Sequence, residues 1–66
     1  MTWVITEEGK KDLLRMVPSK TQAGVAKAIG VTASRLSNVF RGDPVGPKFR
    51  RLIIEAVGES AIKEVD

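Results

Sequence analysis

The sequence predicts an all-α fold, a compact bundle of about five short helices that forms a single domain over residues 1–66. Three observations support this prediction. Apolar residues recur three and four positions apart in successive segments, which is the spacing of one helix face. Threonines, prolines and glycines separate these segments, as they do at helix ends. The chain contains no cysteine and no histidine, so apolar packing must stabilise it in place of disulfides or the usual zinc sites.

The N-terminal residues predict a short extended segment followed by a helix. Thr2 to Ile5 is apolar and β-prone, which suits either an extended arm or an edge strand, and Trp3 is expected to cover the open end of the core. Thr6 is a candidate helix cap, with two glutamates in the first turn where the helix dipole favours negative charge. Pro18 should end this helix one or two residues before it.

Four further helices are expected, at Gln22 to Ile29, about Ala33 to Arg41, Pro47 to Val57 and about Glu59 to Glu64. Thr21 or Ser19 can cap the first of them, and Gly30 can end it because glycine adopts the left-handed backbone conformation without a steric penalty. Thr32 offers a hydroxyl cap to the next helix. Pro47 suits the first position of a helix, where its missing N–H has no partner to lose.

Positive charge is concentrated in the middle of the chain. From residue 15 to residue 51 the net charge is +7, because eight basic side chains are opposed by Asp43 alone. Residues 1–14 carry a net charge of −1, and residues 52–66 carry −3. Such segregation suits a polyanionic partner. An unevenly charged but merely solvated surface is the alternative that charge alone leaves open.

Residues 21–58 contain a longer pattern. It runs T-Q-x-x-V-A-x-x-I-G-V-T-x-x-x-L-S-x-x-x-x-G from Thr21 to Gly42 and continues as P-K-F-x-x-x-I-x-x-x-V-G from Pro47 to Gly58. This pattern resembles the helix-turn-helix of the lambdoid phage repressor and Cro proteins, the XRE family. The resemblance implies a lambda repressor-like DNA-binding domain. It also implies a function as a sequence-specific transcriptional regulator, a Cro-like phage or prophage repressor.

The sequence departs from the family pattern at two positions. Phe40 stands where the family commonly has a glutamate that pairs with an arginine of the first helix, so Phe40 is expected to be packed and Arg15 to be free. Gly24 stands where members often carry the acid of a capping box. A glycine inside a helix costs roughly 1 kcal/mol relative to alanine, so Gly24 should weaken the second helix.

In helix-turn-helix proteins the start of the second motif helix meets base edges in the major groove. The base-reading residues expected here are Thr32, Ala33, Ser34, Arg35 and Asn38. Asn38 suits bidentate pairing with adenine, Arg35 suits a guanine or a phosphate, and Ala33 suits a thymine methyl group. The expected phosphate-binding residues are Thr21, Gln22, Arg41, Lys48, Phe49 through its amide, and Arg51, with Arg50 as a further candidate.

The expected partner is operator DNA bound by a homodimer, because one such domain covers only half of a palindromic site. The resemblance places the dimer contacts at Ala61, Ile62 and Val65, with strand pairing through residues 3–5 as the alternative. A protein-interaction module, such as an antitoxin or anti-repressor, is the competing function class. Neither catalysis nor a metal, cofactor or small-molecule ligand is expected. No membrane segment or signal peptide is apparent, which favours the cytoplasm of a bacterial host, near the nucleoid.

Overall fold

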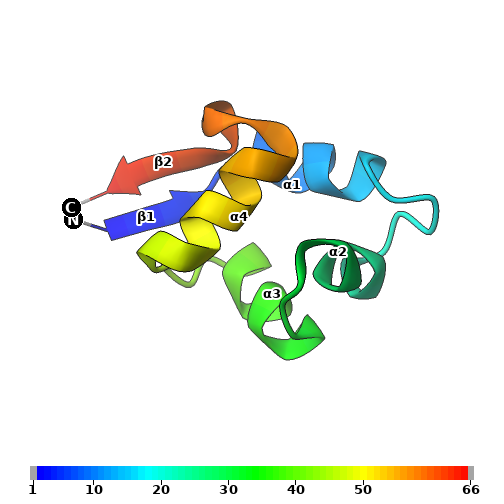
Figure 1. Cartoon of the computed structure of the whole chain (residues 1–66). Helices are drawn as coiled ribbons and strands as arrows, with labels where there is room; N and C mark the ends of the chain where they lie inside the picture. The colour runs from blue at the N-terminus through cyan, green and yellow to red at the C-terminus, as the bar shows by residue number, and fades with distance from the viewer. Residues whose placement is uncertain (1, 66) are drawn as a thin grey trace.

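The computed structural model describes residues 2–65, which form four α-helices, one short 3-10 helix and two antiparallel strands (Figure 1). The elements in chain order are β1 (Thr2–Ile5), α1 (Glu7–Arg15), α2 (Gln22–Ile29), α3 (Ala33–Phe40), α4 (Pro47–Val57), the 3-10 helix η1 (Glu59–Ala61) and β2 (Ile62–Val65). The domain is mostly helical, and the small sheet corrects the all-α prediction. No helix among these residues is long and apolar enough to cross a membrane.

Local capping explains the helix boundaries. Threonine hydroxyls accept hydrogen bonds from backbone amides at the starts of the first three helices, at Thr6, Thr21 and Thr32. Ser19 is therefore not the cap of α2. Gly30 ends α2 with φ 80° and ψ 32°, the left-handed conformation that the sequence predicts there. The expected bounds of α2 and α4 are confirmed, whereas α3 ends one residue before the expected Arg41.

The helix expected at residues 59–64 is wrong. Residues 59–61 form a single 3-10 turn, and residues 62–65 pair with β1. The register joins Thr2 to Val65, Trp3 to Glu64, Val4 to Lys63 and Ile5 to Ile62. So short a segment gains too little from local hydrogen bonds to stay helical, whereas strand pairing satisfies its backbone groups. The same pairing shows that residues 2–5 form a strand rather than a free arm.

β1 has a partner on each side. Besides its pairing with β2, Trp3 forms an antiparallel bridge with Val45, whose amide donates to the Trp3 carbonyl at 2.8 Å. The residue after β1 is also anchored, because the Thr6 amide donates to the Ala61 carbonyl at 2.8 Å and the Thr6 hydroxyl donates to the Ser60 carbonyl at 3.0 Å. These bonds tie the start of α1 to η1 and the loop before α4 to the sheet.

Each α-helix contributes to one apolar core. The largest fully buried side chains are Leu13, Val25, Leu36, Val39 and Ile53. Trp3 and Ile62 pack against this core from the sheet, as expected for Trp3. In the view of Figure 1, α2 and α3 lie below α1 and α4, and β2 lies on the opposite side of the molecule. The fold thus leaves α2 and α3 together on a side that the β2 strand does not cover.

Candidate nucleic-acid interface

α3 has one buried and one exposed face. Leu36, Val39 and Phe40 are buried in the core, so the prediction that Phe40 is packed is confirmed. Residues 32–35, at the start of the helix, are all exposed. This exposed row offers two hydroxyls, a methyl group and a guanidinium, which are groups that can contact base edges.

The start of α2 is built from three small residues. The Thr21 hydroxyl accepts a hydrogen bond from the Gly24 amide at 3.1 Å and lies 3.0 Å from Ser19 Oγ. A Cβ on Gly24 would lie 2.2 Å from Ser19 Oγ. The glycine that replaces the capping-box acid therefore makes room for Ser19. The Ser19 hydroxyl shares a hydrogen bond with the Thr21 hydroxyl, the cap of α2. Thr21 and Gln22 remain exposed beside it.

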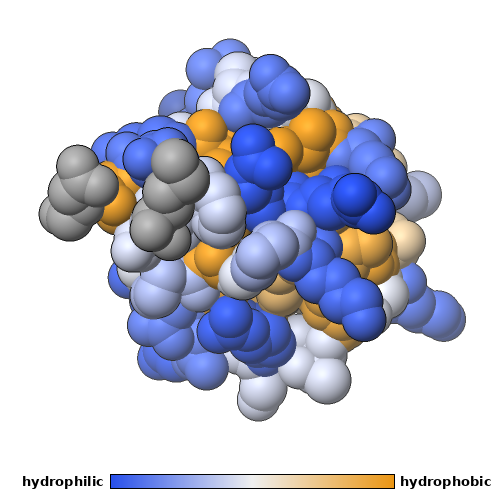
Figure 2. Space-filling model, turned by 60° about the vertical axis from the view of Figure 1, so that its left-hand side comes forward, coloured by the Kyte–Doolittle hydropathy of each residue, from blue (hydrophilic) through white to orange (hydrophobic). Residues whose placement is uncertain are grey.

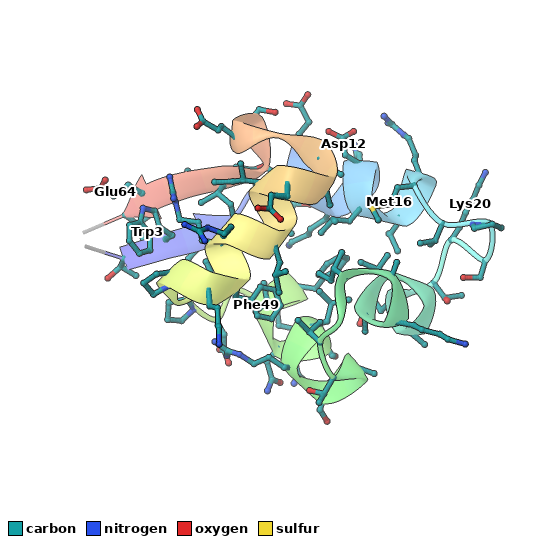
Figure 3. The ribbon with its side chains drawn as sticks, in the orientation of Figure 1. Trp3, Asp12, Met16, Lys20, Phe49 and Glu64 are labelled. Atoms are coloured by element: carbon teal, nitrogen blue, oxygen red, sulfur yellow. The ribbon has the colours of Figure 1, made fainter. Side chains whose placement is uncertain are left out.

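Arg35 joins α3 to the segment that begins α4. Its Nη2 donates to the Pro44 carbonyl at 3.3 Å, and its guanidinium carbon lies 5.6 Å from the centre of the Phe49 ring. Figure 3 shows Phe49 beside the first turns of α4, on the side that faces α3. A guanidinium carries five N–H donors, so these contacts leave most of them free. Arg35 thus has a fixed position that its place in the sequence did not predict.

Asn38 and Arg41, expected respectively to read a base and to bind a phosphate, contact each other. The Asn38 Oδ1 accepts a hydrogen bond from Arg41 Nη2. The backbone carbonyl of Asn38 accepts two further hydrogen bonds, from the backbone amides of Arg41 and Asp43, both at 3.1 Å. Asn38 is half-buried and Arg41 is exposed. The structure therefore makes one polar unit from two residues that sequence reasoning treated separately.

The start of α4 has open amides and nearby cations. Gly46 precedes Pro47 at the helix start, and no side chain caps the helix. The amides of Lys48 and Phe49 therefore have no partner within the helix, as at any uncapped helix start. Lys48 and Arg51 are exposed and line a shallow pocket together with Pro47. Phe49 itself is buried, so its backbone amide alone can contact a phosphate.

Both ion pairs among residues 2–65 lie on α1. On α1, Lys10 Nζ lies 2.9 Å from Glu7 Oε1, and this ammonium lowers the pKa of the Glu7 carboxyl by hydrogen bonding and charge attraction. Arg15 Nη1 lies 3.2 Å from Asp12 Oδ1, so the expectation that Arg15 is free is wrong. No other ion pair occurs among residues 2–65, so the basic side chains of α3 and α4 pair with no carboxylate.

Arg50, the further candidate for a phosphate contact, packs against Trp3 of the sheet. Its guanidinium carbon is 5.0 Å from the centre of the Trp3 ring, and its Nε is buried without a hydrogen-bond partner. Figure 3 shows Trp3 beside Glu64 at the open end of the sheet. Figure 2 shows this end of the molecule, where hydrophilic side chains separate the hydrophobic patches. Arg50 thus packs on the sheet, a contact between distant residues that no local sequence signal indicates.

The three residues expected at a dimer interface do not share one accessible surface. Ala61 is fully buried, and a Cβ on Gly9 would lie 2.8 Å from the Ala61 Cβ, so this side chain contacts α1. Ile62 packs against the core, and Val65 is half-buried at the outer end of β2. Residues 3–5, the alternative interface, pair within the chain. Of the expected contacts, Ala61 is therefore excluded by burial.

Comparison with known proteins finds no matching family, no matching curated protein and no matching solved structure. Within residues 2–65, no group of three or more acidic side chains is placed to hold a metal ion. The functional argument therefore depends on the geometry and chemistry of the residues described above.

Proposed function

We propose that this chain is a sequence-specific DNA-binding repressor of the Cro type, in which α2, the turn at Gly30 and α3 act as a helix-turn-helix. The observation that carries this proposal is the exposure of residues 32–35 on a helix whose other face is buried at Leu36, Val39 and Phe40. A helix anchored in this way can present its first turns to the major groove, which is wide enough for one helix. The resemblance of residues 21–58 to the XRE family supports the same assignment.

Phosphate contacts would come from both sides of α3. At the start of α2, Thr21 and Gln22 are exposed, and at the start of α4 the open amides of Lys48 and Phe49 lie beside the Lys48 and Arg51 side chains. Backbone amides at helix starts favour anions because the helix dipole adds to their donor capacity. These contacts would set the position of the domain on the duplex without reading its sequence.

Base contacts would come from the exposed row on α3. Ser34 and Ala33 are free to approach base edges, and Thr32 combines its capping role with a position at the edge of the row. Arg35 reaches the groove from a site fixed by Phe49 and Pro44, which suits a phosphate or a guanine at the edge of the contact. The polar character of this row favours sequence reading over uniform backbone binding.

A two-fold dimer on a palindromic operator follows from the size of the domain, because α3 covers one half-site. β1 is paired on both sides, whereas none of the described residues pairs with the outer edge of β2. An unpaired strand edge is a surface that a second copy can extend. We place the dimer contact on this edge, with Val65 in place of the buried Ala61.

The test is the selection of bound duplexes from a randomised DNA pool at near-physiological salt. A palindrome with half-sites about one helical turn apart is expected. Recovery of DNA without a consensus would contradict sequence reading. Failure to recover any duplex, together with tight binding of a co-purifying protein, would favour a protein-interaction module instead. Single-stranded DNA of the same composition serves as the matched control for purely electrostatic binding.

A further inference from the structure

The Asn38 amide is held in one orientation by its surroundings. The Arg41 guanidinium has only hydrogen-bond donors, so the atom that faces it must be the Asn38 oxygen rather than the nitrogen. The two backbone bonds to the Asn38 carbonyl fix the chain from residue 38 to residue 43 and keep Arg41 close. Rotation of the amide by half a turn would place two N–H groups against a cation.

This orientation leaves the Asn38 nitrogen free. None of the described residues accepts a hydrogen bond from Nδ2, and the only buried side-chain nitrogen or oxygen without a partner in residues 2–65 is Arg50 Nε. Asn38 Nδ2 also has no partner but is not one of these buried atoms, so it is in contact with solvent. Its hydrogens are also stronger donors than those of an isolated amide, because the guanidinium polarises the carbonyl that it contacts. Together, the side chains of Asn38 and Arg41 offer a ligand many hydrogen-bond donors and few acceptors.

We propose that Arg41 is a positioning residue that makes Asn38 select guanine over adenine, an inference that rests on the proposed DNA-binding function. In the major groove adenine presents one acceptor and one donor, so a bidentate asparagine needs both its oxygen and its nitrogen free. Guanine presents two acceptors, N7 and O6, which match a donor-only pair. The guanidinium beside the Asn38 oxygen also opposes the amino hydrogens of adenine. The adenine contact expected from the sequence is replaced by a guanine contact.

The test compares the preferred base at each operator position for the natural chain and for Arg41→Ala, Arg41→Lys and Asn38→Ala. The natural chain should favour guanine over adenine at one position in each half-site by roughly five- to hundredfold. Asn38→Ala should remove the preference at that position alone. Arg41→Ala frees the Asn38 oxygen and should shift the same position toward adenine, and Arg41→Lys should retain part of the guanine preference because its ammonium also has only donors.

Lys27→Ala is the matched control for the loss of one positive charge. Lys27 is exposed on α2, and among residues 2–65 no hydrogen bond or ion pair joins it to Asn38, so the base preference should stay that of the natural chain. Arg41 is exposed, and within residues 2–65 its side chain bonds only to Asn38, so circular dichroism should show that Arg41→Ala keeps the fold. A shift that appears equally in Lys27→Ala would overturn the inference, because charge alone would explain it.

The possible failures are distinguishable. If the natural chain and Arg41→Ala select the same base at every position, the positioning role of Arg41 is overturned and the proposed function stands. If the natural chain selects no consensus, the proposed function fails and this inference fails with it. The Asn38 side-chain amide resonances of the DNA-free protein give a separate readout. They should move in Arg41→Ala and stay unmoved in Lys27→Ala, and unmoved resonances in both would contradict the contact itself.

Discussion

Gly9 lets two distant segments approach closely. It lies on α1 and is buried, and a Cβ at this position would lie 2.6 Å from the Ala61 carbonyl oxygen and 2.7 Å from the Ala61 Cα. Real Cβ atoms do not reach such distances, and the atoms they would meet belong to the backbone of η1. The glycine is therefore a packing requirement at the junction of α1 with the C-terminal segment.

Gly9→Ala should destabilise the domain although alanine is the better helix former. The methyl group must displace the Ala61 backbone, and overpacking of this kind costs about 1–3 kcal/mol. Urea unfolding monitored by circular dichroism measures this cost. Lys11→Ala, an exposed change on the same helix, should stay within about 0.5 kcal/mol of the natural chain. Equal stability of Gly9→Ala and Lys11→Ala would contradict the close approach.

Lys20 is the single non-glycine residue with positive φ among residues 2–65, at 53°. Figure 3 shows its side chain at the tip of the loop between α1 and α2, pointing away from the core. The conformation is unfavourable for a residue with a long side chain, and asparagine tolerates it better. Lys20→Asn should therefore raise the free energy of unfolding by up to about 1 kcal/mol. Lys27→Asn, inside α2, should lower the free energy of unfolding because asparagine is a poorer helix former than lysine. Thermal unfolding of both variants tests this comparison.

At the scale of the elements, helix ends could be predicted because their signals are local. Thr21 and Gly30 bracket α2, and Pro47 and Gly58 bracket α4, at the expected positions. The segment after Gly58 could not be assigned in the same way. Its spacing allows a helix, but its partner is a strand at the other end of the chain, and a local pattern does not reveal that pairing.

The start of α2 provides a test of how neighbouring residues share a cap. Gly24→Ala should gain roughly 1 kcal/mol from helix propensity but displace Ser19 Oγ from Thr21, so the net change should be small. In the Ser19→Ala background the 2.2 Å contact is removed and only Thr21 Oγ1, 3.2 Å from the new Cβ, must shift slightly, so the same change should gain more than it does in the natural chain. A double-mutant cycle by urea unfolding measures the coupling. An equal gain in both backgrounds would mean that Ser19 moves aside without cost.

At the scale of the whole molecule, the candidate site was predictable as a list of residues but not as a set of contacts. The exposure of residues 32–35 follows from helical periodicity, and the sequence predicted it. The attachment of Arg35 to Phe49 and the pairing of Asn38 with Arg41 depend on rotamers and on the return of the chain after α3. Ala61 was misassigned because its burial depends on the close approach of Gly9.

The segregation of charge predicts strongly salt-dependent binding. In the proposed complex each neutralised phosphate contributes about −0.9 to the slope of log K against log salt concentration. Lys48→Ala should weaken binding to all duplexes alike and reduce the magnitude of the slope by roughly 1. Lys11→Ala removes the same charge from an exposed position on α1, outside the proposed DNA and dimer contacts, and should leave the slope unchanged. Titrations at several salt concentrations distinguish these results, and equal slopes for both variants would contradict the phosphate contact of Lys48.

The pairing of the first strand with the last has a consequence for the order in which the domain forms during synthesis. β1 leaves the ribosome first, yet its main partner is residues 62–65, so the loop that this contact closes contains nearly the whole domain. The helices depend on nearer contacts and can assemble earlier. Until β2 emerges, Ile5 has no strand partner, and the part of the α1 surface at Gly9 that Ala61 later covers is open to water. The sheet therefore closes last, after translation of the helices is complete.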